Sequence, residues 1–255
     1  EKMETTPKDC ENIANLYKAK HQRQNALSWV ENGLKLEKKG GWGNQSSFGL
    51  TELKQDLLHK LGRKEDALDF AWTEFKMYPS DFSYETLMKF VGKKDVKHWH
   101  QKALEKTKGT SLSGFIDICV KTREWDTLAE HISSIDAELL ESLSHYTTER
   151  AVKGLPKKHG LTTAKMYSAL GVRILKKGKS KYYQYALEHF RNARKLYEKA
   201  GQDQLWFDLV ERVRRDHSRK HSFIGYFEEI VDKRPLKKPE SFEKRAQKRW
   251  KKQIS

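Results

Sequence analysis

Along most of this chain, apolar side chains recur every three or four positions, the spacing that places them on one face of an α-helix. Residues 164–171 and 185–193 show this pattern most clearly. In both segments small residues stand among large ones, so two helices could approach closely while the large side chains fill the space between them. The small residues are Gly171, Ala186 and Ala193, and the large ones are Tyr167, Leu170, Leu187, Phe190 and Leu196. The pattern predicts a pair of antiparallel helices.

The same spacing predicts further helices, most of them in pairs. Stripes run over 26–36, 50–61, 67–75, 82–91, 96–104, 115–119, 125–132, 205–213 and 223–230. Phe82 is taken as a member of its stripe. Residues 61–68 read as a joint between two helices, and Gly62 is a candidate C-cap. The stripe over 135–152 is expected to be continuous, until residues 153–160 break it.

These pairs predict an all-α, tetratricopeptide-like helical repeat, or α-solenoid, over residues 1–232. Alanines are expected near the start of several second helices, at Ala26, Ala67, Ala103 and Ala186, with irregular spacing. One helix pair cannot bury both of its faces alone. Several pairs must therefore stack into a superhelix, which offers a concave surface to a ligand.

The composition agrees with such a thin fold. Apolar residues make up 36% of the chain and charged residues 34%, which suits amphipathic helices that each bury one stripe. Segments with the alternation of half-buried strands are scarce, so almost no sheet is expected.

The composition changes after residue 232. Residues 233–255 contain ten Lys or Arg against Glu240 and Glu243. The net charge of this segment is therefore half of the +16 of the whole chain. This segment is predicted to be a basic linker followed by a C-terminal amphipathic helix. Its apolar stripe consists of Phe242, Ala246, Trp250 and Ile254.

Basic residues gather in this tail and at the predicted joint between the last two helices. Lys and Arg neutralise phosphates, and an aromatic ring such as Trp250 can stack on a base. The candidate residues for binding phosphate or an acidic partner are Arg214, Arg215, Arg219, Lys220, Lys237, Lys238, Lys244, Arg245, Lys248, Arg249, Lys251 and Lys252. In a second interpretation, the tail helix caps the last repeat and its charges only face solvent.

No catalytic, cofactor or metal site is expected. His217 and His221 lack a third ligand beside them, and His98 and His100 would face different ways on a helix. Residues 40–43 are glycine-rich, but they follow a predicted helix. A dinucleotide-binding turn follows a strand, so these residues are not assigned to one. The two cysteines, Cys10 and Cys119, are too few for a disulfide framework.

The sequence has no apolar run long enough to span a membrane and no signal-peptide core, so a cytoplasmic protein is expected. Residue 1 is Glu, which is consistent with a piece of a longer chain.

Four motifs carry a family resemblance: residues 61–68, Trp72, the segment Tyr78-Pro79-Ser80, and residues 213–223. Together they resemble uncharacterised bacterial helical-repeat proteins, and the region that follows the zinc module in SWIM zinc-finger proteins. The likeness covers most of residues 20–231. It implies a tetratricopeptide-like scaffold, associated in some members with DNA-linked or defence functions. The zinc signature itself is absent, so no zinc site is carried over.

The leading prediction is a non-enzymatic scaffold that binds a protein partner in its concave face. The basic tail would add affinity for an acidic partner. The alternative is direct nucleic-acid binding through the basic residues, with an affinity that falls steeply as salt rises.

Overall fold

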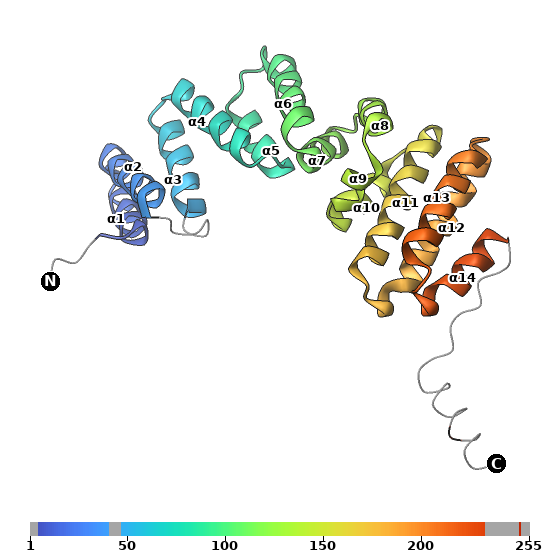
Figure 1. The fold of residues 1–255 in the computed structure, drawn as a ribbon. Helices are drawn as coiled ribbons and strands as arrows, with labels where there is room; N and C mark the ends of the chain where they lie inside the picture. The colour runs from blue at the N-terminus through green and yellow to red at the C-terminus, as the bar shows by residue number, and fades with distance from the viewer. Residues whose placement is uncertain (1–4, 41–46, 233–249, 251–255) are drawn as a thin grey trace. The chain divides into compact units, whose positions relative to one another are not determined.

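A computed structural model describes residues 5–40, 47–232 and 250 of the chain. It is all-helical: 84% of the described residues are helical, and they contain no strand. The helices divide between two compact units, Glu1–Ile118 (unit 1) and Cys119–Ser255 (unit 2). Figure 1 shows the succession of helices along the chain. The all-α prediction is therefore confirmed.

Consecutive helices of unit 1 pack against one another from α1 to α6. Their bounds are α1 Pro7–Ala19, α2 Arg23–Gly40, α3 Ser47–Lys60, α4 Lys64–Met77, α5 Asp81–Phe90 and α6 Val96–Thr110. The boundary between the units falls inside α7, Leu112–Thr122.

In unit 2, helix α11 is central and contacts α8, α9, α10, α12 and α13. The helices after α7 are α8 Trp125–Ser134, α9 Ala137–Ser142, α10 His145–Gly154, α11 Gly160–Lys177, α12 Tyr183–Lys199, α13 Asp203–His217 and α14 His221–Val231. Two 3₁₀ turns, Lys157–His159 and Ser180–Tyr182, precede α11 and α12.

One turn geometry recurs at four joints between helices. At each joint a single residue adopts a left-handed backbone, with φ between 59° and 74°, and the next helix begins two residues later. The N–H of the following residue donates to the carbonyl five positions before it, the bond of a Schellman helix end. The left-handed residues are His21 between α1 and α2, Gly62 between α3 and α4, Arg123 between α7 and α8, and Gly201 between α12 and α13.

The joint at Gly62 is the one that the sequence predicts. The N–H of Gly62 donates to the His59 carbonyl at 3.0 Å, and that of Arg63 donates to the Leu58 carbonyl at 3.0 Å. Glycine adopts a φ of 74° without the steric cost that a Cβ would add. His21 and Arg123 adopt the same conformation although they have a Cβ. Because neither is a glycine, the sequence does not mark them as the left-handed residues of their joints.

The core of unit 1 is tightly packed at Gly33 of α2. A Cβ added there would stand 2.8 Å from Leu50 Cδ1 and 2.9 Å from Cys10 Cβ. Because Gly33 has no side chain, α2 can lie against both α1 and α3. The buried members of this core are Ala14, Ala26, Leu27, Val30, Leu50, Leu53, Leu57, Leu58 and Ala67.

The core of unit 2 contains the helix pair predicted from small and large residues. Helices α11 and α12 pack together, and the Phe190 ring lies against Gly171. Arg194 of α12 is buried, donates to the Ile230 carbonyl at the end of α14, and lies over the Trp206 ring at 5.9 Å. This arginine therefore links α12 to both α13 and α14.

Two details of the predicted pattern are wrong. Ala26, Ala67 and Ala186 each occupy the fourth position of a helix, but Ala103 lies one turn further, in the middle of α6. The stripe over 135–152 is not continuous, because the chain turns at Leu143 and the Ser144 side chain accepts from the Tyr146 N–H to cap a new helix. Tyr146 itself is 71% exposed.

None of the helices in the described part of the chain combines the length and the apolar character that crossing a bilayer requires.

Candidate functional site

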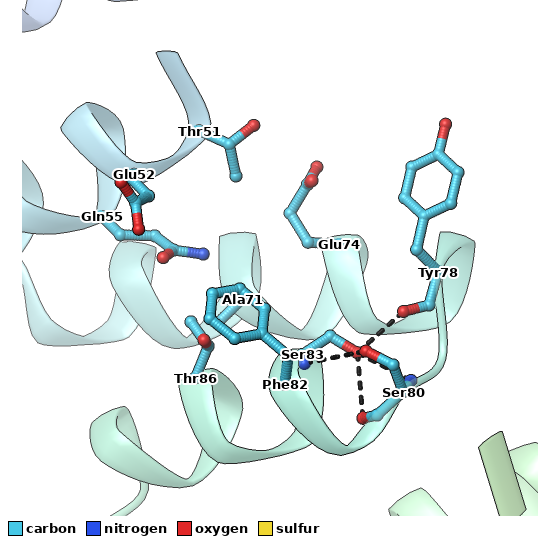
Figure 2. Close-up of a pocket in the computed structure, with 10 residues that line it drawn as sticks. All are labelled: Thr51, Glu52, Gln55, Ala71, Glu74, Tyr78, Ser80, Phe82, Ser83 and Thr86. Carbon is cyan, nitrogen blue, oxygen red and sulfur yellow. Dashed lines mark hydrogen bonds between the residues drawn. The ribbon is translucent and has the colours of Figure 1, made fainter. Parts of the chain in front are cut away.

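A depression of unit 1 lies between α3, α4 and α5, with a volume of about 280 Å³ (Figure 2). Its floor is largely apolar and includes Ala71 and the ring of Phe82, which is 52% exposed. The sequence placed Phe82 in a core stripe, and that assignment is wrong. The remaining lining residues are Thr51, Glu52 and Gln55 from α3, Glu74 and the C-cap Tyr78 from α4, and the N-cap Ser80, Ser83 and Thr86 from α5.

A second depression, of about 650 Å³, adjoins the first along α1, α3 and α5. Both are lined by Glu52, Gln55, Phe82 and Thr86, so they adjoin each other, and we call the two together the unit 1 groove. The groove thus runs along α1, α3 and α5, with α4 lining part of it. Its other lining residues are Glu11, Asn15, Lys18, Gly49, Leu53, Asp56, His59, Lys89 and Phe90.

A capping box fixes the α4–α5 joint beside the groove. The Ser83 N–H donates to Ser80 Oγ at 3.1 Å, and the Ser80 N–H donates to Ser83 Oγ at 3.0 Å. Ser83 Oγ also donates to the Tyr78 carbonyl at 2.7 Å. These bonds satisfy backbone groups at the start of α5 and hold its first turn, which carries Phe82, in place.

The groove is acidic, in contrast to the chain as a whole. Its lining contains Glu11, Glu52, Asp56 and Glu74 against Lys18 and Lys89, while the chain carries a net charge of +16. Lys8 and Lys60 compensate Glu11 and Asp56 from outside this lining, at 2.8 and 3.0 Å. Glu52 and Glu74 have no such pair among the described residues, and these two carboxylates favour a cationic ligand.

The acidic side chains differ in how far their charge is compensated. Burial alone would raise the pKa of Asp56, but Lys18 and Lys60 donate hydrogen bonds to it, and the pKa is held below its usual value. The Lys18 Nζ lies 2.7 Å from Asp56 Oδ2. Burial raises the pKa of Glu74, although the charges of Lys38 and Lys54 oppose this shift. In the part of the chain that the structure describes, neither Glu52 nor Glu74 forms an ion pair.

Unit 2 contains a mainly apolar pocket of about 390 Å³ between α9, α11 and α13. Lys165 on its wall donates to the carbonyls of Ile132, Ser133 and Ile135, at 2.9, 3.0 and 2.6 Å. Burial lowers the pKa of this amine, and the charge of Asp136 opposes that shift. Since the ammonium group caps the end of α8, its role in this pocket is structural.

Glu141, on the opposite wall of this pocket, is also structural. Its side chain is 1% exposed and lies between two cations. Arg212 Nη2 is 2.6 Å from Glu141 Oε1, and Lys176 Nζ is 2.8 Å from Oε2.

The basic residues predicted at the α13–α14 joint are partly compensated by carboxylates. Arg214 forms a two-bond pair with Glu228, at 3.0 and 2.7 Å, and a third bond to Glu211 at 2.8 Å, contacts that raise its pKa. Arg215 lies 3.0 Å from Asp216. Arg219 and Lys220 follow at the turn before α14.

The other predicted basic residues lie outside the described part of the chain: Lys237, Lys238, Lys244, Arg245, Lys248, Arg249, Lys251 and Lys252. The predicted stacking residue Trp250 is described, and it is 70% exposed.

The histidines considered as metal ligands are separated by the fold. His217 ends α13 and His221 begins α14, so they do not share a helix face. His100 is 2.8 Å from the Tyr84 hydroxyl through Nδ1. Among the described residues, no three His, Cys, Asp or Glu side chains are grouped so that they could hold a metal ion.

Comparison with known proteins adds no assignment. No protein-family model matches the chain, and a search of curated proteins gives no significant match. The resemblance to the region after the SWIM zinc module therefore stays a prediction.

Proposed function

We propose that this chain is a tetratricopeptide-like helical-repeat scaffold that acts by binding, not by catalysis, and whose unit 1 groove holds a segment of a partner protein. The observation that carries the proposal is the course of the groove across α1, α3 and α5. In stacked helix pairs, the first helices line one shared face, and ligands bind there.

The recurring joint supports a repeat architecture. His21, Gly62, Arg123 and Gly201 have the same backbone conformation, with the same bond pattern and the same distance to the next helix. A repeated helix–turn–helix unit would place equivalent turns at such joints, although this helix end is common in proteins generally. A cytoplasmic location is part of the same proposal and rests on the sequence.

The size of the groove fits a short extended segment. Its two depressions have volumes of about 280 and 650 Å³. Ligand sites in proteins typically have about 300–1,000 Å³, which accommodates a few side chains of such a segment. The partly apolar lining offers contact area, and its polar side chains can select the sequence.

The alternative prediction, nucleic-acid binding, is less well supported in the described residues. Arg214 and Arg215 are both directed to carboxylates, which compete with phosphates for the same donors. Titration of labelled oligonucleotides at two salt concentrations tests this alternative. Tight binding that weakens steeply with salt would favour it over the scaffold.

An array of immobilised random-sequence peptides, probed with the full chain, tests the groove. Gln55 lines both parts of the groove, and Gln55→Trp would fill it. The matched control is Gln101→Trp on α6, where the side chain is exposed outside the groove. We expect Gln55→Trp to lose a set of peptides that the control retains. If the two variants bind the same peptides, the proposed function is wrong.

A further inference from the structure

Two carboxylates, those of Glu52 and Glu74, line the depression between α3, α4 and α5 and indicate which ligand it could bind. Figure 2 shows Glu52 and Glu74 extending from α3 and α4, with the Phe82 ring in the same pocket. Glu52 is exposed and Glu74 is half-buried, and both lack an ion pair among the described residues. A cationic side chain is therefore the natural partner for this pair of groups.

The floor between these carboxylates favours a ligand with an apolar part. Ala71 is fully buried beneath the opening, and the Phe82 ring presents half of its surface. An ammonium or guanidinium group on a methylene stem can place its stem on such a surface while its charge meets a carboxylate. An aliphatic neighbour in the ligand would cover the remaining apolar area.

We propose that the unit 1 groove takes a basic segment of a partner protein, with a Lys or Arg side chain between Glu52 and Glu74 and an adjoining apolar side chain on Ala71 and Phe82. This inference rests on the proposed function, because it names the chemistry of the segment that the groove holds. It differs from the acidic partner predicted from the net charge, because Glu52 and Glu74, which form no ion pair among the described residues, are opposite in sign to the net charge of the whole chain.

Local and global charge make separable predictions. A basic chain attracts acidic peptides to its whole surface, so the total affinity of a peptide does not show how much of it binds in the groove. Binding in the groove is measured as the part of the affinity that Gln55→Trp removes. The wild-type chain and this variant are compared with three fluorescent peptides that share a leucine–serine pattern and carry lysine, glutamate or serine at the variable positions.

We expect the groove-dependent affinity to be highest for the lysine peptide. Each exposed or half-buried charge pair contributes modestly, so Glu52→Gln combined with Glu74→Gln should weaken this peptide by about three- to tenfold. Glu52→Lys should weaken it further and increase the groove-dependent affinity of the glutamate peptide. The matched control is Glu65→Gln, which removes an exposed carboxylate from α4 outside the groove and should change neither affinity.

The outcomes separate this inference from the proposed function. If Gln55→Trp removes peptides from the array but the groove-dependent affinity is equal for lysine and glutamate peptides, the inference is overturned and the scaffold stands. The inference also fails if the double Glu→Gln variant binds the lysine peptide as the wild type does. If Gln55→Trp removes no peptide at all, the proposed function itself fails. Helical circular dichroism of each variant confirms that it folds.

Discussion

The Phe190 ring lies against the backbone of Gly171, so that a Cβ at this position would stand 2.7 Å from Phe190 Cζ. The ring cannot retreat easily, because Phe223 and Phe227 pack against it with ring centroids 6.0 and 5.1 Å away. We expect Gly171→Ala to lower the free energy of unfolding by about 1–3 kcal/mol, since overpacking strains the core. Urea denaturation followed by circular dichroism measures the change.

The control for this prediction is Gly225→Ala in α14. A Cβ at Gly225 would meet nothing within 4 Å, so only the helix propensity changes. Alanine at this position should stabilise unit 2 by about 0.5–1 kcal/mol. If both substitutions had the same sign, the close approach at Gly171 would not be what limits the side chain there.

The four equivalent joints predict a second set of substitutions. His21 and Arg123 hold a left-handed backbone with φ of 59° and 61°, which costs a residue with a Cβ about 1–2 kcal/mol. Glycine removes this cost but loses about 0.5–1 kcal/mol in chain entropy. We therefore expect His21→Gly and Arg123→Gly to stabilise the chain by about 0.5–1 kcal/mol, as measured by urea denaturation.

Two further variants separate backbone strain from the loss of a side chain. His21→Ala removes the imidazole but keeps the Cβ, so it should give no gain. Gly62→Ala imposes the strain at the equivalent joint and should cost about 1 kcal/mol. Stabilisation by His21→Ala equal to that by His21→Gly would show that the imidazole, and not the backbone, is the unfavourable group.

The sequence predicts those parts of the fold that depend on local periodicity. The apolar stripes locate the α11–α12 pair, and Gly171 identifies its closest contact. Apolar residues continue at helical spacing through the turn between α9 and α10. The spacing alone therefore does not reveal this turn, and the two helices read as one segment. The left-handed residues His21 and Arg123 could not be predicted, because neither is a glycine.

The groove could not be predicted in the same way. Phe82 occupies an apolar position of α5, and only the tertiary arrangement leaves it half-exposed. Glu52 and Glu74 belong to different helices, and each looks like an ordinary solvent-facing charge in the sequence. Net charge was also misleading as a guide to this surface, since the carboxylates without an ion pair there, Glu52 and Glu74, have the opposite sign.

The buried carboxylate of Glu141 supports a prediction about coupling. Because Lys176 and Arg212 each contact one of its oxygens, either cation alone still compensates the charge. We expect Lys176→Met and Arg212→Met to cost about 1 kcal/mol each, and the double variant to cost about 3–5 kcal/mol, because it leaves the carboxylate unpaired. Urea denaturation of the wild type, the two single variants and the double variant measures this coupling. If the losses in the free energy of unfolding of the two single variants simply add up to that of the double variant, the prediction is wrong.

Glu37 of α2 makes the stability of unit 1 depend on pH. Burial raises the pKa of this carboxyl, and the charges of Glu11 and Glu74 raise it further. Its Oε1 atom is buried and accepts no hydrogen bond from any described residue. A carboxyl whose pKa is higher in the folded state disfavours folding when it is ionised.

The sign of the effect follows from these two states. Because the pKa is higher in the folded state, folding is penalised at any pH above the unfolded pKa of about 4.3, pH 7 included. Below that pKa both states are protonated and the penalty vanishes. We therefore expect Glu37→Gln to stabilise the chain at pH 7 and to give a smaller gain, approaching zero, as the pH falls below about 4. Glu105→Gln, at an exposed position of α6, is the control and should give no such trend. Thermal unfolding over this pH range measures both variants, and a gain for Glu37→Gln that persisted at acid pH would mean that the amide forms a new contact instead of removing a buried charge.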